Sequence, residues 1–146
     1  MADHFTLVII NRKSFGNASV KSRKNMKNCL IVVNTQKELS LNFANRIADY
    51  LTAQGISSSF YNFDGFSSDN PFPGNDFVIT LGGDGTVLFA ARGCVDLKIP
   101  VFPVNFGEFG FIASIQKEEW QTQLDLFLQG KLPVVMRSMV HAALIR

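Results

Sequence analysis

The stretch from Val78 to Arg92 constrains the fold more than any other, because three glycines and one aspartate join two apolar segments there. The run 78–81 has the composition of a buried strand, and the small, apolar residues after Thr86 are typical of a helix packed closely on a sheet. In the turn 82–85, a ligand can approach backbone N–H groups and meet a single acidic side chain. The stretch therefore predicts a strand, a glycine-rich loop and a helix over about 86–94, capped by Thr86.

A glycine-rich turn has a second interpretation. Glycine permits positive φ and aspartate is a common solvated turn residue, so the same residues suit a plain connection from strand to helix. The loop lacks the Lys and Ser/Thr of a Walker A sequence, and no GxGxxG fingerprint follows a first strand. The loop alone leaves a phosphate cradle and a simple turn both open.

Strand-like and helix-like segments alternate along the chain. Strands are predicted at residues 5–11, 29–34, 56–61, 76–81 and 99–104, and helices at about 40–54, 86–94 and 114–129. Ser40 and Ser114 are the expected helix caps, and Gly55 and Gly130 the expected helix ends. The alternation predicts a Rossmann-like α/β fold, an open parallel sheet with helices on both faces and the loop 82–85 at the carboxyl end of a central strand.

A second glycine-bearing loop follows the strand predicted at 99–104. Asn105, Gly107 and Gly110 mark a place of close backbone approach, with an amide side chain at its start. Because ligands of open parallel sheets bind at the carboxyl ends of the strands, this loop should lie beside the loop 82–85.

Two further expectations concern side chains around this second loop. Phe109 and Phe111 are expected in the core, with their neighbouring glycines turning the chain. Pro100 and Pro103 each remove a hydrogen-bond donor, which favours an edge position or a strand start for 99–104.

Composition narrows the function classes. The chain of 146 residues, 47% hydrophobic and 18% charged, has the size and balance of an ordinary globular domain. Basic residues gather in 12–27, whereas acidic residues outnumber basic ones from Asn28 onward, so nucleic acid is not an expected partner. No apolar run reaches the roughly 18 residues of a membrane span and no signal peptide is apparent, which favours the cytoplasm. Cys29 and Cys94 have no metal-ligand spacing and are expected to be reduced thiols.

The segments Leu81-Gly-Gly-Asp-Gly-Thr86 and Val104-Asn-Phe-Gly-Glu-Phe-Gly-Phe-Ile112 together resemble the N-terminal domain of NAD kinases. That family pairs a GGDGT loop with a later N-x-G-x-x-G-F segment. Diacylglycerol kinases, sphingosine kinases and 6-phosphofructokinases carry similar GGDGT loops, but the second segment, with its order and spacing, favours NAD kinase.

The resemblance implies phosphoryl transfer from ATP, or from inorganic polyphosphate, to the 2′-hydroxyl of the adenosine ribose of NAD, with a divalent metal such as magnesium assisting. By the same resemblance, Asp84 is the general base or orienting group for that hydroxyl. Phosphate-lining residues would be Gly82, Gly83, Gly85 and Thr86. Residues bordering the NAD pocket would be Asn105, Phe106 and Gly107, with Phe106 against a nicotinamide or adenine ring. No protein residue is predicted as a metal ligand.

The sequence also suggests a division of the chain. Residues 1–27 are expected to form a basic, flexible extension, with Met26 as an alternative start, and residues 28–133 the NAD kinase-like α/β domain. Residues 134–146 resemble the start of a crossover into a second, β-rich domain that the family carries and that the chain is expected to lack. The resemblance further implies a homo-oligomer. A non-catalytic nucleotide-binding module completed by another chain, and a lipid or sugar kinase domain, remain alternatives.

Overall fold

The computed structural model describes residues 7–11, 25–38, 40–108, 110–132 and 134–138. In chain order the elements are β1 (Leu7–Asn11), β2 (Asn28–Asn34), α1 (Ser40–Ala53), β3 (Ser57–Phe63), β4 (Phe77–Gly82), α2 (Asp84–Cys94), β5 (Val101–Asn105), β6 (Ile115–Gln116), α3 (Trp120–Leu128) and β7 (Val134–Ser138).

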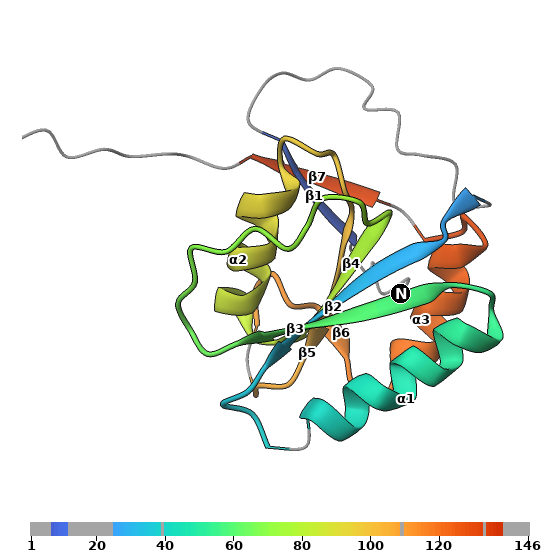
Figure 1. The fold of residues 1–146 in the computed structure, drawn as a ribbon, viewed down its shortest axis with the longest axis horizontal. Coiled ribbons are helices and arrows are strands. Elements are labelled where there is room, and N and C mark those ends of the chain that lie inside the picture. The colour runs from blue at the N-terminus through green and yellow to red at the C-terminus, as the bar shows by residue number, and fades with distance from the viewer. Residues whose placement is uncertain (1–6, 12–24, 39, 109, 133, 139–146) are drawn as a thin grey trace, which may run out of the picture.

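The centre of the molecule is an open parallel sheet (Figure 1). Strands β3, β2, β4 and β5 lie side by side in that order and all run parallel, and the short β6 continues the parallel pairing along the end of β5. This confirms the predicted α/β class. Strand β4 lies between β2 and β5, so the glycine-rich loop that follows it is at the carboxyl end of a central strand.

The strand predicted at 5–11 is present as β1, whereas its pairing in the sheet and strand β7 were not predicted. Strand β1 pairs antiparallel with β5 through Val8 and Val101, and β7 pairs parallel with β1 from Leu7↔Val134 to Asn11↔Ser138. Strand β1 falls inside the segment 1–27 expected to be an extension. The proposed division of the chain into an extension, a domain and a crossover remains a prediction.

The three central strands are apolar on both faces, as expected for strands covered by helices on each side. Ile31, Ile79 and Phe102 stand in register and pack in one core with α1 and α3, and their neighbours Val78 and Val101 face the core under α2. Figure 1 shows α2 on one side of the sheet and α1 with α3 on the other. Burying one side chain of this size contributes about 1.5–3 kcal/mol, so the two cores hold the helices on the sheet.

Of the two positions that the prolines favoured, the strand start holds for Pro100, which directly precedes β5, and the edge position does not hold. Strand β5 pairs with β4 on one side and with β1 and β6 on the other, so it is not an edge strand. The N–H of Phe106 donates to the Gly82 carbonyl of β4, and alternation along a parallel ladder turns the nitrogen of Pro103 to the other side. On that side β1 pairs at Val101 and β6 pairs from Val104 onward. Pro103 lies between these two pairings, where its missing N–H removes no ladder hydrogen bond.

Helix α3 begins later than predicted. Ser114 was expected to cap a helix over 114–129, but Ile115 and Gln116 form β6 and the helix runs from Trp120 to Leu128. The free flank of β5 accepts the buried Ile115 as a strand neighbour, and this non-local pairing outweighs the local cap signal. The expected apolar face of the helix and its end at Gly130, where φ is 76°, are both confirmed.

Candidate functional site

The two glycine-bearing loops meet at the carboxyl edge of the sheet, as the sequence predicted. Gly82 ends β4 and stands in register with Asn105, the last residue of β5. The N–H of Phe106 donates to the carbonyl of Gly82 at 2.9 Å. The loops therefore form one surface.

Asp84 is the residue that ties the two loops together. Its Oδ1 accepts the backbone N–H groups of Ile112 and Ala113, each at 3.0 Å, and its Oδ2 accepts the N–H of Phe111 at 3.0 Å. Asp84 is also the first residue of α2, where a carboxylate interacts favourably with the positive end of the helix. One side chain thus fixes the second loop to the start of the helix.

The electrostatics of Asp84 follow from these contacts. Partial burial raises the pKa of its carboxyl group, but the N–H groups of Ala113, Phe111 and Ile112 stabilise the charged form and leave the pKa below the usual value for aspartate. Asp84 is therefore a carboxylate at neutral pH. Each carboxylate oxygen has about two lone pairs, so Oδ2, with a single N–H partner among the described residues, has room to accept one more donor.

The glycines of the site have two different roles. A Cβ added to Gly82 would lie 2.3 Å from Oγ1 of Thr86, and one added to Gly110 would lie 2.7 Å from the carbonyl oxygen of Ala113. At these two positions any larger side chain would clash with the neighbouring atoms. In contrast, a Cβ at Gly83 or Gly85 meets no atom within 4 Å, so the backbone there borders open space.

The start of α2 offers unused hydrogen-bond donors beside this space. Gly83 is the N-cap residue and has no side-chain cap bond. The N–H groups of Asp84 and Gly85 lie in the first helical turn, where no intrahelical acceptor exists. Neither has an acceptor among the residues that the structure describes. Such a helix terminus favours an anion.

Thr86 does not have its predicted role as the helix cap, because α2 begins two residues earlier. Its side chain is buried, and Oγ1 accepts a hydrogen bond from Nδ2 of Asn34 at 3.5 Å. Asn34 ends β2 at the same edge of the sheet, so the rule that ligands bind at the carboxyl ends of strands would have singled it out.

The residues predicted in the second loop take different positions. Asn105 is buried and its Oδ1 accepts the N–H of Gly107 at 2.8 Å, which shapes the turn. Phe106 packs edge-to-face on Phe43 of α1, with ring centroids 5.0 Å apart. Phe111, which was expected in the core, is instead 93% exposed beside Asp84, because its N–H is held by the carboxylate while its ring extends into solvent. Phe109 lies outside the described residues.

The described residues do not form a protein metal site. No group of three or more His, Cys, Asp or Glu side chains comes together there, and Asp84 already accepts three N–H groups. The thiols of Cys29 and Cys94 are free and buried, and burial raises the pKa of Cys94 to about 12. The helices of the described part are too short or too polar to cross a bilayer.

An open parallel sheet with a glycine-rich loop and a helix N-terminus at its carboxyl edge is an arrangement found in α/β proteins that bind ligands at this edge, phosphorylated ligands among them. Comparison with known proteins narrows the class. Residues 72–132 match the ATP-NAD kinase N-terminal domain. The chain is 42% identical over 122 residues to an NAD kinase of Treponema denticola, covering 83% of this chain and 43% of that protein.

Other relatives agree. An NAD kinase of Treponema pallidum (strain Nichols) is 32% identical over 135 residues, which is 92% of this chain and 41% of the relative. One of Clostridium botulinum (strain Loch Maree) is 31% identical over 122 residues, 82% of this chain and 43% of the relative. The chain belongs to the NAD kinase family, and it spans less than half the length of these relatives.

Proposed function

We propose that this chain supplies the N-terminal, phosphate-binding part of an NAD kinase, which transfers a phosphoryl group from ATP to the 2′-hydroxyl of the adenosine ribose of NAD and releases NADP. The observation that carries this proposal is Asp84, held between the two loops beside the unused N–H groups at the start of α2. Both substrates are phosphorylated, and this edge offers donors to phosphates and one carboxylate to a hydroxyl.

The phosphates are assigned to the start of α2. Gly83 and Gly85 border open space, so phosphate oxygens can approach the backbone closely. Gly82 and Thr86 contribute indirectly, because Gly82 makes room for the Thr86 side chain and Thr86 anchors the first turn of the helix to Asn34.

Asp84 is assigned to the ribose hydroxyl that attacks. The free lone pair of Oδ2 can accept the hydrogen bond of that hydroxyl and orient its oxygen toward the phosphorus. A carboxylate with a lowered pKa is a weak base. Its contribution is therefore orientation, with the proton accepted late as the bond to phosphorus forms.

One aromatic side chain is assigned to the nucleotide rings. Phe111 is exposed next to Asp84 and offers a ring face to a base. The contact predicted for Phe106 with a nicotinamide or adenine ring stays a prediction of the family resemblance, because that ring packs on the α1 side of the sheet. The hydrogen bond from the N–H of Gly107 to Asn105 shapes the turn that carries Phe106.

The remaining assignments rest on the family. ATP is proposed as the donor, with polyphosphate as the alternative, and magnesium is proposed to enter with the donor's phosphates because the described residues do not make a metal site of their own. A homo-oligomer in the cytoplasm is also proposed, and the free, buried cysteines suit a reducing compartment.

The test is NADP formation from ATP, magnesium and NAD. The purified chain and any longer product of its gene are each assayed, with NADP measured by a coupled NADP-specific dehydrogenase. Turnover by the longer product, and NAD binding by both, are expected. Binding of NAD by the longer product without any NADP would instead support the non-catalytic module, and absence of both binding and turnover would refute the nucleotide assignment.

A further inference from the structure

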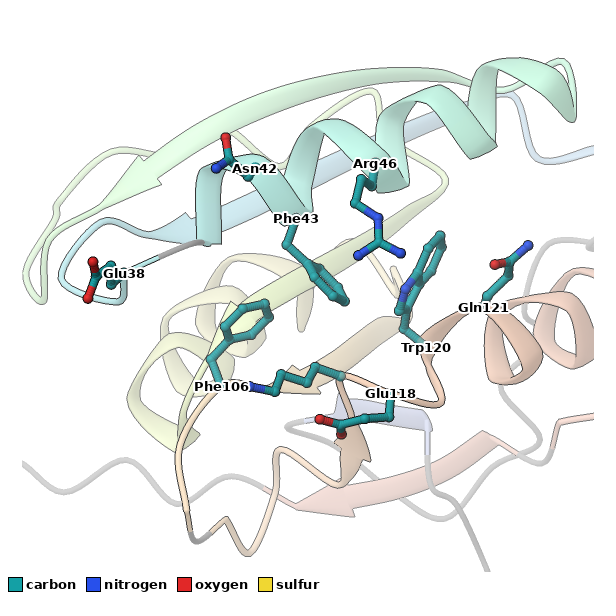
Figure 2. A pocket seen from close by; sticks show the side chains of 9 residues that line it. Glu38, Asn42, Phe43, Arg46, Phe106, Glu118, Trp120 and Gln121 are labelled. Atoms are coloured by element: carbon teal, nitrogen blue, oxygen red, sulfur yellow. The ribbon is translucent and has the colours of Figure 1, made fainter.

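A separate pocket of about 570 Å³ lies between α1, α3 and the end of β5, on the face of the sheet opposite α2 (Figure 2). Its volume falls within the range of small-molecule sites, roughly 300–1,000 Å³. The residues that line it are Glu38, Asn42, Phe43, Arg46, Phe106, Lys117, Glu118, Trp120 and Gln121. Asp84 and Phe111 are not among them.

Three aromatic rings form the apolar part of the pocket. Phe43 packs edge-to-face against Phe106 at 5.0 Å and against Trp120 at 5.8 Å between ring centroids. Phe43 and Phe106 are only half-buried, so part of each ring borders the pocket. Rings that meet edge-to-face, here at 88° and 68°, favour a flat ligand, which can stack on one ring and place its edge against another.

Two cations border the same space. The guanidinium of Arg46 lies 5.5 Å from the centroid of the Phe43 ring, and Lys117 is also part of the lining. Among the described residues, no carboxylate forms an ion pair with either cation. Figure 2 shows Arg46 beside the rings of Phe43 and Trp120, whereas the carboxylate of Glu38 lies apart from them. Glu118 also lines the pocket, so the lining carries two carboxylates and two cations. The charged group that lies against a ring is the guanidinium of Arg46.

We propose that this pocket is a second ligand site, distinct from the phosphate site at α2, and that it binds a planar aromatic or heteroaromatic anion. The ring of the ligand would stack among Phe43, Phe106 and Trp120, and its carboxylate or phosphate would bind Arg46 and Lys117. An arginine next to an aromatic ring suits this ligand class, since the planar guanidinium binds an anionic group with paired hydrogen bonds.

The geometry also connects this pocket to the first site. The side chain of Phe106 lines the pocket while its N–H binds the carbonyl of Gly82. A ligand in this pocket therefore contacts a residue whose backbone is hydrogen-bonded to the glycine-rich loop.

The single tryptophan of the chain provides a direct assay, because its indole N–H gives one resolved signal in a ¹H–¹⁵N correlation spectrum. The complete chain is titrated with naphthalene-2-carboxylate and, separately, with AMP, which distinguish a simple aromatic acid from a nucleotide. Saturable movement of the Trp120 signal by at least one of the two is expected. No movement by either probe at millimolar concentration would overturn the proposal.

Matched variants and ligands test the recognition chemistry. Arg46→Gln should weaken binding about tenfold, as expected for the loss of a charge-assisted hydrogen bond, and Arg92→Gln, which removes a cation from α2, should leave it unchanged. The neutral naphthalene-2-carboxamide should bind more weakly than the carboxylate. Equal binding of the amide and the acid, or equal loss in both arginine variants, would contradict the assignment.

One further variant separates this proposal from the function proposed above. Asp84→Asn should leave the titration with naphthalene-2-carboxylate unchanged, whatever its effect on NADP formation. Loss of that binding in Asp84→Asn would show that the pocket is part of the nucleotide site and would overturn the claim of a second site.

Discussion

Gly85→Ala is expected to stabilise the fold and, at the same time, to weaken nucleotide binding. Gly85 is the second residue of α2, it is exposed, and a Cβ built on it meets no atom within 4 Å. Alanine loses less conformational freedom than glycine when a helix forms, by about 0.5–1 kcal/mol. For a domain of this size, that gain raises the melting temperature by about 1–4 °C.

The same methyl group would stand in the space assigned to the phosphates. It would hold phosphate oxygens away from the N–H groups at the start of α2, so affinity for ATP should fall at least about tenfold, the equivalent of one charge-assisted hydrogen bond. Stability is measured by circular dichroism on heating, and affinity by isothermal titration calorimetry.

Asn45→Ala is the matched control, because Asn45 is exposed in the middle of α1 and the change also favours the helix. It should raise stability without changing the affinity for ATP. If Gly85→Ala bound ATP as tightly as the unmodified chain, the phosphate assignment would fail. A lower melting temperature for Gly85→Ala would show that the open space at Gly85 is occupied in solution.

Three further predictions concern the fold around the site. Gly110→Ala should lower the free energy of unfolding by about 1–3 kcal/mol in chemical denaturation, because its Cβ would lie 2.7 Å from a backbone oxygen that cannot turn away; an unchanged midpoint would contradict this. Phe102→Ala should cost about 3–5 kcal/mol through the cavity left in the core, and a loss under 1 kcal/mol would show that the core can collapse. The pKa of Asp84 is lowered on folding, so its contribution to stability is present above the unfolded pKa of about 3.9 and is lost as the pH falls through the lower, folded value. Asp84→Asn should therefore flatten that part of the curve of unfolding free energy against pH. An identical curve for the variant would refute the role of the three N–H bonds.

Much of the sheet could be predicted because its signals are local. Strands β2 and β4 are marked by continuous apolar runs. Helix α1 is marked by its helical spacing and by Gly55, with φ of 75°, after its end. Each of these patterns lies within a few residues. Strand β6 could not be predicted in this way. It is two residues long and exists because Ile115 completes the flank of β5, a pairing that no local pattern records.

The meeting place of the two loops was predictable, and the contacts made there were less so. The meeting of the two loops follows from the rule for parallel sheets, and the N–H groups of residues 111–113 that donate to the Asp84 carboxylate confirm it. The exposure of Phe111 was not predictable, since an apolar ring next to glycines is usually buried and only the tertiary structure shows that its backbone is held at the surface. The sequence also could not show that Gly82 is packed against the Thr86 side chain whereas Gly83 borders open space, since this depends on the tertiary structure.

The most direct test of the central claim is the turnover number of Asp84→Asn in the longest product of this gene that makes NADP. Asparagine keeps the size of the side chain and one oxygen acceptor, so the protein should fold and still bind NAD with a similar KM. We predict that kcat falls at least about 100-fold, as expected for the loss of a group that orients and then accepts a proton from the attacking hydroxyl. Undiminished kcat in a folded Asp84→Asn protein would contradict the claim that this carboxylate acts on the ribose hydroxyl.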